Sequence, residues 1–275
     1  MKDLPLDDEA GDIIGKAQSG LQITDGMLAD QTGLARERFT ALRKGEQDME
    51  ALKAAAAVLG LHVGRLQALA EGKWCPKASE VTGLKGFTTP FMDFSTNAFV
   101  VWDAASKKGV AFDSGMDAKP ILEFVRSEGI DVELILITHT HQDHVARLPE
   151  LREGLGNPPA YCSTKESETG VDTFEPGKCF TVGGLKIETR LTWGHSPGGT
   201  TFVISGLEKP VAIVGDALIA GSIGGPRIDY DAARDTIRSE IFSLPDETIL
   251  CSGHGPLTTV GEEKAHNPFF PEFAK

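Results

Sequence analysis

His139-Thr-His-Gln-Asp-His144 places three imidazoles and a carboxylate within six residues. It follows Leu134-Ile-Leu-Ile137, a short apolar run that predicts a buried strand, so these side chains stand on the loop at a strand end. Burying them without partners would cost several kcal/mol. Divalent metal ions compensate for that cost, because zinc, iron and manganese accept neutral imidazole and carboxylate as ligands. The stretch therefore predicts that His139 and His141 bind one ion and that Asp143 and His144 bind a neighbouring one.

Three further predicted strands are also followed by residues that can bind metal. His195 comes soon after the predicted strand 185–191, Asp216 follows 211–214, and His254 follows 248–251. Side chains at strand ends on one rim of a sheet sandwich converge in one cleft. We therefore expect these three residues to join the histidine-rich loop. Other predicted strands are 98–102, paired as a hairpin with 109–112, then 134–137, 180–182 and 200–204, with helices over 118–127 and 145–151.

Composition and charge restrict the class of protein. The 275 residues carry a net charge of -13, which argues against a general binder of polyanions. No apolar run approaches the roughly 18 residues of a membrane span. The beginning of the chain, Met1 to Glu9, is acidic where a signal peptide would be basic and then apolar. We expect a cytoplasmic protein with no membrane partner, in which the four scattered cysteines are reduced thiols.

Residues 1–74 are predicted to form a separate helical domain. Apolar residues recur there at helical spacing, and Gly33, Gly45, Gly60 and Gly72 fall where helices should stop. The pattern indicates about five short helices, one of them capped by Thr24. Residues 75–89 are predicted to be a linker, because Lys73-Trp-Cys-Pro-Lys-Ala-Ser-Glu80 breaks the helical pattern. The catalytic domain is then expected over 90–275.

Leu28-Ala-Asp-Gln-Thr-Gly-Leu34, with the basic residues after it, resembles the helix-turn-helix of phage-repressor-type DNA-binding domains. The resemblance implies a recognition helix near 34–44, with Arg36, Arg38 and Arg43 as candidate DNA contacts. However, residues 1–74 hold nine Lys+Arg against twelve Asp+Glu, a net of about -3, and DNA affinity depends on neutralising phosphates. We therefore favour a domain that forms a homodimer or covers the active site, and keep DNA binding as the lesser interpretation.

The metal-ligand motifs and their order resemble those of the metallo-β-lactamase superfamily. The segments Gly215-Asp-Ala-Leu-Ile-Ala-Gly-Ser-Ile-Gly224 and 254–269 are similar, more narrowly, to short glyoxalase II-like hydrolases. The resemblance implies an α+β fold: an αββα sandwich preceded by the small all-α domain. It also implies a first metal held by His139, His141 and His195, and a second held by Asp143, His144 and His254. Asp216 would bridge two divalent ions, zinc before iron or manganese.

Such a pair of ions would supply hydroxide near neutral pH for attack on a carbonyl, with Asp143 orienting it and taking up its proton. Tyr161 and Tyr230 are the only phenols, and neither lies in a recognised motif, so no protein acid is assigned to the leaving group. A thiolate leaves more readily than an alkoxide or an amine, since the pKa of a thiol is near 8.5. We therefore expect a small-molecule thioester as substrate. Arg227 has two open interpretations: a clamp for an anionic part of the substrate, or a surface residue.

Three other functions are weighed against this hydrolase. A mononuclear iron persulfide dioxygenase would use His139, His195 and Asp216 alone, whereas Gly253-His254-Gly-Pro supplies a ligand for a second ion. An antibiotic-hydrolysing lactamase is expected to carry an export leader, and a lactonase a phenol near the metals. A DNA-binding regulator with a ligand-sensing metal domain is disfavoured by the acidic helical segment.

Overall fold

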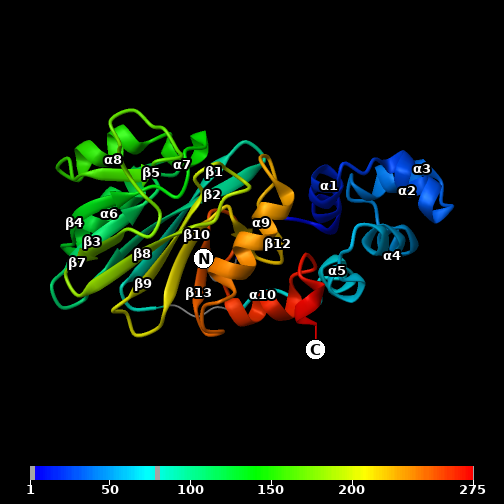
Figure 1. The fold of residues 1–275 in the computed structure, drawn as a ribbon. Helices are drawn as coiled ribbons and strands as arrows, with labels where there is room; N and C mark the ends of the chain where they lie inside the picture. The colour runs from blue at the N-terminus through cyan, green and yellow to red at the C-terminus, as the bar shows by residue number, and fades with distance from the viewer. Residues whose placement is uncertain (1–3, 78–80, 275) are drawn as a thin grey trace.

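Two β-sheets stacked face to face form the centre of the computed structural model, which describes residues 4–77 and 81–274 (Figure 1). Each sheet has six strands, in the orders β1-β2-β3-β4-β5-β6 and β14-β13-β10-β9-β8-β7. The first consists of β1 (Leu84–Phe91), β2 (Phe94–Trp102), β3 (Lys108–Phe112), β4 (Asp131–Leu136), β5 (Ala160–Ser163) and β6 (Asp172–Phe174). The second consists of β7 (Cys179–Val182), β8 (Leu185–Leu191), β9 (Thr200–Ser205), β10 (Val211–Gly215), β13 (Ile249–Ser252) and β14 (Thr258–Thr259).

Apolar side chains from the two sheets interdigitate between them. Phe112 of β3 meets Phe202 of β9 with ring centroids 5.4 Å apart, and Leu136 and Ile213 are buried in the same cluster. Helices α6 (Lys119–Glu128) and α8 (Leu148–Gly154) cover the outer face of the first sheet, where Ile121 and Leu151 are fully buried. The predicted hairpin is confirmed, because β2 and β3 pair antiparallel. The α+β sandwich expected from the sequence is thus the observed fold.

Strand β1 begins at Leu84, inside the stretch 75–89 that the sequence predicted as a linker. Strand β1 contains Gly86 and Pro90, which weaken the strand signal in the sequence. The proline is tolerated because β1 lies at the edge of its sheet. Residues 78–80 of the predicted linker lie outside the described residues. The chain therefore enters the first sheet earlier than the composition of this stretch suggested.

The N-terminal segment folds into α1 (Ala10–Leu21), α2 (Asp25–Thr32), α3 (Arg36–Leu42), α4 (Met49–Val58) and α5 (Val63–Ala70). The Thr24 hydroxyl accepts a hydrogen bond from the Met27 amide at 3.2 Å and caps α2, as predicted. Gly33, Gly45, Gly60 and Gly72 all have positive φ, which is why helices end there. No helix among the described residues is long and apolar enough to cross a membrane.

These five helices lie beside α9 (Tyr230–Thr236) and the C-terminal segment (Figure 1) and share one hydrophobic cluster with buried residues of the second sheet. The cluster joins Ile13 of α1 and Phe39 of α3 to Val214 of β10 and to Phe269 and Phe270 near the end of the chain. It also takes in residues of α9, the π-helix η1 (Ile237–Ile241) and α10 (Val260–His266). The helical segment and the sandwich therefore bury apolar surface against each other.

A buried arginine joins the same parts of the chain. The guanidinium of Arg65 in α5 donates to the carbonyl oxygens of Asn267 and Phe270 at 3.0 and 2.8 Å. The His62 amide donates to the Pro268 carbonyl at 2.9 Å. The short 3₁₀ helix η2 (Pro271–Phe273) follows directly. Hydrogen bonds thus reinforce the apolar contact between α5 and residues 267–270.

Replacing Phe269 with alanine is expected to lower the free energy of unfolding by about 3–5 kcal/mol, because its fully buried ring fills the shared cluster. Urea denaturation followed by circular dichroism measures this change. Met27→Ala is the control, since that side chain is 43% exposed and its loss should change stability by under about 0.5 kcal/mol. Equal midpoints for wild type and Phe269→Ala would contradict the shared core.

Candidate metal centre

Seven side chains from both sheets meet at one edge of the sandwich. His139 and His141 lie between β4 and the one-turn helix α7 (Gln142–Val145), which carries Asp143 and His144. His195 follows β8, Asp216 follows β10 and His254 follows β13. The sequence predicted a loop after the first ligands and a helix from 145. The chain instead turns helical at Gln142, and this turn directs Asp143 and His144 into the site.

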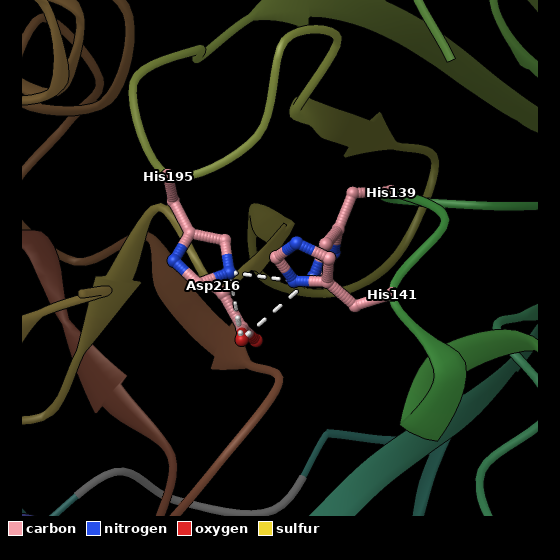
Figure 2. Close-up of side chains that lie close together, drawn as sticks. All are labelled: His139, His141, His195 and Asp216. Atoms are coloured by element: carbon pink, nitrogen blue, oxygen red, sulfur yellow. Dashed lines mark hydrogen bonds and ion pairs between the residues drawn. The ribbon is translucent and has the colours of Figure 1, made fainter. Parts of the chain in front are cut away.

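Four of the side chains form a first group of ligand atoms (Figure 2). His139 Nε2 and His195 Nε2 each lie 3.0 Å from His141 Nδ1. Asp216 Oδ2 lies 3.8 Å from His139 Nε2 and 3.4 Å from His195 Nε2. Three nitrogens and one carboxylate oxygen therefore face a common point.

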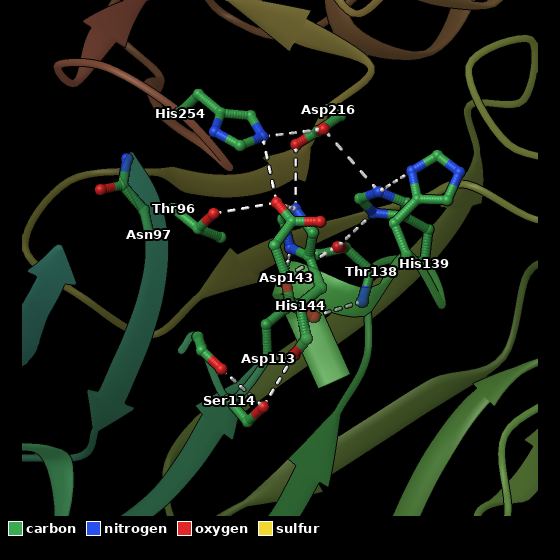
Figure 3. A network of polar contacts seen from close by, with 12 residues as sticks. Thr96, Asn97, Asp113, Ser114, Thr138, His139, Asp143, His144, Asp216 and His254 are labelled. Atoms are coloured by element: carbon green, nitrogen blue, oxygen red, sulfur yellow. Dashed lines mark hydrogen bonds and ion pairs between the residues drawn. The ribbon is translucent and has the colours of Figure 1, made fainter. Parts of the chain in front are cut away.

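The remaining three side chains form a second group next to the first (Figure 3). Asp143 Oδ2 lies 3.4 Å from His144 Nε2 and 3.5 Å from His254 Nε2. Asp216 reaches this group as well, with Oδ1 3.3 Å from His144 Nε2 and Oδ2 3.0 Å from His254 Nε2. The Asp216 carboxylate thus lies between the two groups, where a bridging ligand is expected.

The donor atoms fit two metal ions. Ligands about 2.1 Å from a tetrahedral ion lie about 3.4 Å from one another, and the contacts above range from 3.0 to 3.8 Å. Two of these atoms, His144 Nε2 and Asp216 Oδ1, are buried and have no hydrogen-bond partner. An unpartnered buried polar atom costs free energy that a bound cation would remove. The chemistry of the donor set and its orphaned atoms both favour a metal pair.

The other ring nitrogens hold the histidines in place. His195 Nδ1 lies 2.8 Å from the Gly225 carbonyl oxygen, and His254 Nδ1 lies 2.7 Å from that of Ser95. His144 Nδ1 lies 2.8 Å from Asp113 Oδ2. Each acceptor takes the proton on Nδ1, so Nε2 is the nitrogen directed at the ligand groups.

The protonation of His139, His195 and Asp216 suits cation binding. Burial lowers the pKa of His139 well below its usual value and that of His195 to about 4, so both rings are neutral. Burial acts to raise the pKa of Asp216, but the imidazoles of His254 and His144 outweigh it and hold that pKa well below its usual range. The shared carboxylate is therefore ionised.

Sequence reasoning missed the residues that support the ligands. Asp113, at φ 58° directly after β3, accepts hydrogen bonds from the Thr138 amide and hydroxyl, both at 2.8 Å, and orients His144 (Figure 3). Its position after a buried strand is the signal that identified Asp216, so it could have been found. Thr96 donates to Asp143 Oδ2 at 2.9 Å. No local pattern marks a threonine in this role.

Two further side chains, Glu166 and Asn97, hold the loops that carry the ligands through hydrogen bonds. Glu166 accepts hydrogen bonds from the Thr140 hydroxyl at 2.6 Å and from the Gly198 amide at 2.8 Å, so it joins the first histidine loop to the loop after His195. The Asn97 amide group donates to the carbonyl oxygens of Ser252 and Gly255 at 3.0 and 2.9 Å, on either side of His254. Both contacts link segments far apart in sequence, which a single sequence does not reveal.

The two tyrosines and Arg227 lie outside the two ligand groups. Tyr161 packs against Phe180 in the core between the sheets, and Tyr230 packs against Phe269 on the outer face. Arg227 lies on the exposed loop after β12 (Ser222–Ile223), which pairs with β11 (Leu218–Ile219), and two residues earlier Gly225 holds His195.

The candidate DNA-binding arginines belong to α3 and the residue after it. Arg38 forms ion pairs with Asp48 and Glu50 at 2.6 and 2.8 Å. Arg43 pairs with Asp25 at 2.7 Å, while the Arg36 side chain lines a surface hollow beside Arg43. These acidic partners compete with phosphate for two of the three guanidinium groups. DNA binding by this segment stays a prediction.

Gly253→Ala is expected to empty the site of metal without unfolding the chain. A Cβ there would lie 2.1 Å from Asp216 Oδ1 and 2.7 Å from His144 Cε1, so the ligands would have to move. Metal content per chain, measured by plasma mass spectrometry, should fall well below that of wild type while circular dichroism is retained. In the Gly26→Ala control the nearest atom lies 3.7 Å from the new Cβ, and metal content should not change. Full occupancy in Gly253→Ala would contradict the arrangement.

Asp113→Asn should weaken metal binding about 10–100-fold, because an amide is unable to accept all three hydrogen bonds that orient His144 and Thr138. Competition with a chromophoric chelator measures this affinity. Asp131→Asn makes the same isosteric change at an exposed position and should leave it unaltered. Equal affinities for the two variants would rule out the proposed support.

A known family and several known proteins are similar in sequence to this chain. The profile of the Metallo-beta-lactamase superfamily matches residues 91–254, which is more than half of the chain. The hydroxyacylglutathione hydrolase GloC of Haemophilus influenzae is 29% identical over 204 residues, covering 66% of this chain and 95% of that protein. The human mitochondrial persulfide dioxygenase ETHE1 is 26% identical over 181 residues, covering 63% of this chain and 70% of that protein.

Solved structures agree on the fold. The B3 metallo-beta-lactamase BLEG-1 superposes with a TM-score of 0.59 at 29% identity, covering 68% of this chain and 99% of that one. TTHA1623, in a di-iron-bound form, superposes with a TM-score of 0.55 at 27% identity, covering 66% of this chain and 99% of that one. The superfamily profile begins at residue 91, so helices α1–α5 lie outside the residues it matches. The sandwich, the ligand groups at its edge and the match over most of it establish that this chain belongs to the metallo-β-lactamase superfamily.

Proposed function

We propose that this chain is a binuclear metal-dependent hydrolase of thioesters. The observation that carries the proposal is the Asp216 carboxylate, which lies within 3.0–3.8 Å of nitrogens from both histidine groups. Like charges as close as two neighbouring ions repel strongly, and a shared anion reduces that repulsion. A site for one ion has no need of the second group formed by Asp143, His144 and His254.

The two ions, zinc before iron or manganese, would activate a water molecule and polarise the carbonyl of the substrate. The protein's own part is orientation and proton transfer. Thr96 fixes one oxygen of Asp143 at 2.9 Å, and this carboxylate would orient the attacking water and accept its proton. Asp113 and the carbonyl oxygens of Ser95 and Gly225 keep the histidine rings from turning.

A thioester is the substrate class that this site suits best. Tyr230 is buried in one hydrophobic core and Tyr161 packs against the other, so neither phenol is placed to protonate a leaving group. A thiolate leaves without such help, because thiols are much more acidic than alcohols or amines. The similarity to a hydroxyacylglutathione hydrolase supports the same class, and a hydroxyacylglutathione is the first substrate to test.

A mononuclear iron persulfide dioxygenase is the second candidate, favoured by the similarity to human ETHE1. It would use only His139, His195 and Asp216. The number of ions per chain separates the two functions, since two ions support the hydrolase and a single iron with persulfide-dependent oxygen uptake supports the dioxygenase. We also propose that the protein lies in the cytoplasm and forms a homodimer through α1–α5. Each of these two proposals needs a test of its own.

His139→Ala and Asp216→Ala should lower metal content and reduce thioester hydrolysis to the rate of the uncatalysed reaction, because each removes a ligand from the shared site. A panel of acyl thioesters, assayed on protein of known metal content by release of the thiol, measures this. His62→Ala removes a histidine that caps α5 and should keep the metals, at a cost of about 1 kcal/mol in stability. A fully loaded wild type that hydrolyses none of the panel would sink the proposal.

A further inference from the structure

We infer that helix α1 and the loop 225–227 form a pocket for a carboxylate on the thiol carrier of the substrate, with Arg227 as its anchor. This inference rests on the proposed thioester hydrolase. A cavity of about 400 Å³ separates the helix from the loop. The lining residues that matter here are Asp8, Asp12, Gly15, Lys16, Arg43 and Arg227.

The pocket adjoins the metal centre. Gly225 lines it with its neighbours, and the carbonyl oxygen of the same residue lies 2.8 Å from His195 Nδ1. A substrate whose carbonyl lies at the metals could therefore extend its leaving group past the loop into this cavity.

Close contacts at three points fix α1 as the far wall. A Cβ on Gly20 would lie 2.3 Å from ring carbons of Tyr230, so the helix packs directly on α9. Lys16 Nζ donates to the Ile223 carbonyl oxygen at 2.9 Å, next to the loop. Before the helix begins, Asp7 packs against Gly255, where an added Cβ would lie 3.2 Å from the Asp7 Cβ. The N-terminal segment thus contacts the catalytic domain beside Asp216 and His254.

The charges of the pocket favour one negative group. Lys16 forms an ion pair with Asp8, and Arg43 pairs with Asp25 at 2.7 Å. The Asp12 carboxylate accepts the Glu9 amide at 2.9 Å. Among the described residues no side chain forms an ion pair or hydrogen bond with the Arg227 guanidinium.

A single free guanidinium beside two aspartates suits a monoanion better than a phosphate dianion, which those aspartates would repel. A carboxylate is also the planar anion that a guanidinium binds with two parallel hydrogen bonds. The cavity therefore predicts a carrier that bears a carboxylate.

The first test measures binding without turnover. Calorimetry on the metal-loaded protein compares a carboxylated thioether, 3-(methylthio)propanoate, with its methyl ester. Wild type should bind the acid at least about tenfold more tightly than the ester, since a charge-assisted hydrogen bond contributes that much. Arg227→Ala should remove this preference and Arg227→Lys should keep part of it. Arg126→Ala removes an exposed arginine from α6, on the other sheet, and should keep all of it.

The second test addresses the helix wall. No atom lies within 4 Å of a Cβ added to Gly15, so longer side chains fit there and project from α1. Gly15→Glu and Gly15→Gln have the same shape and differ by one charge. The glutamate variant should bind the acid about tenfold more weakly than the glutamine variant, with equal affinity for the ester.

A preference for the acid that survives in Arg227→Ala would place the carboxylate on the metals and overturn the inference. Equal binding of acid and ester by wild type would do the same, and so would equal binding of the acid by the two Gly15 variants. These outcomes do not depend on hydrolysis. A loaded enzyme that shows the Arg227-dependent preference yet cleaves no thioester would overturn the proposed function alone.

Discussion

The geometry of the site depends on one carboxylate held between two groups of imidazoles. Asp216 is buried and ionised, and its oxygens approach nitrogens of His139, His195, His144 and His254. An isolated buried charge is unstable, so the surrounding rings and the ions they favour are what make this position tolerable. Its neighbours must leave room for it. Gly224 and Gly253 do so, because a Cβ at either would collide with Asp216.

Both sheets are needed to bring the ligands to this carboxylate. Strand β4 of the first sheet leads to His139 and His141, while β8, β10 and β13 of the second lead to His195, Asp216 and His254. Polar contacts then cross between distant segments: Asp113 to His144, Asn97 to the backbone around His254, and Glu166 to Thr140 and Gly198. The apolar core holds the two sheets against each other, and these polar contacts set the orientation of the histidine rings.

Local signals in the sequence named the seven side chains that the structure brings together, and the resemblance to a family implied the sandwich. Histidine and aspartate after apolar runs reveal a strand-end site, and glycines at positive φ reveal helix ends, as at Gly33 and Gly60. Contacts across the chain produce no such signal. The apolar faces of the five helices are visible in the sequence, but the surface that they cover is not. Their place in one cluster with Phe269 and Phe270 could therefore not be foreseen. Likewise, the ion pairs of Arg38 and Arg43 join residues 10 to 18 positions apart.

The bonds from Arg65 to Asn267 and Phe270 affect how the molecule assembles during synthesis. Helix α5 is made early, yet its buried guanidinium finds its acceptors only in residues translated about 200 positions later. Until then the apolar faces of α1–α5 lack the surface that covers them in the finished fold. Helices α1–α5 are therefore secured only after residues 267–270 have been made. Newly made α1–α5 must therefore be kept from binding other proteins until residues 267–270 have left the ribosome.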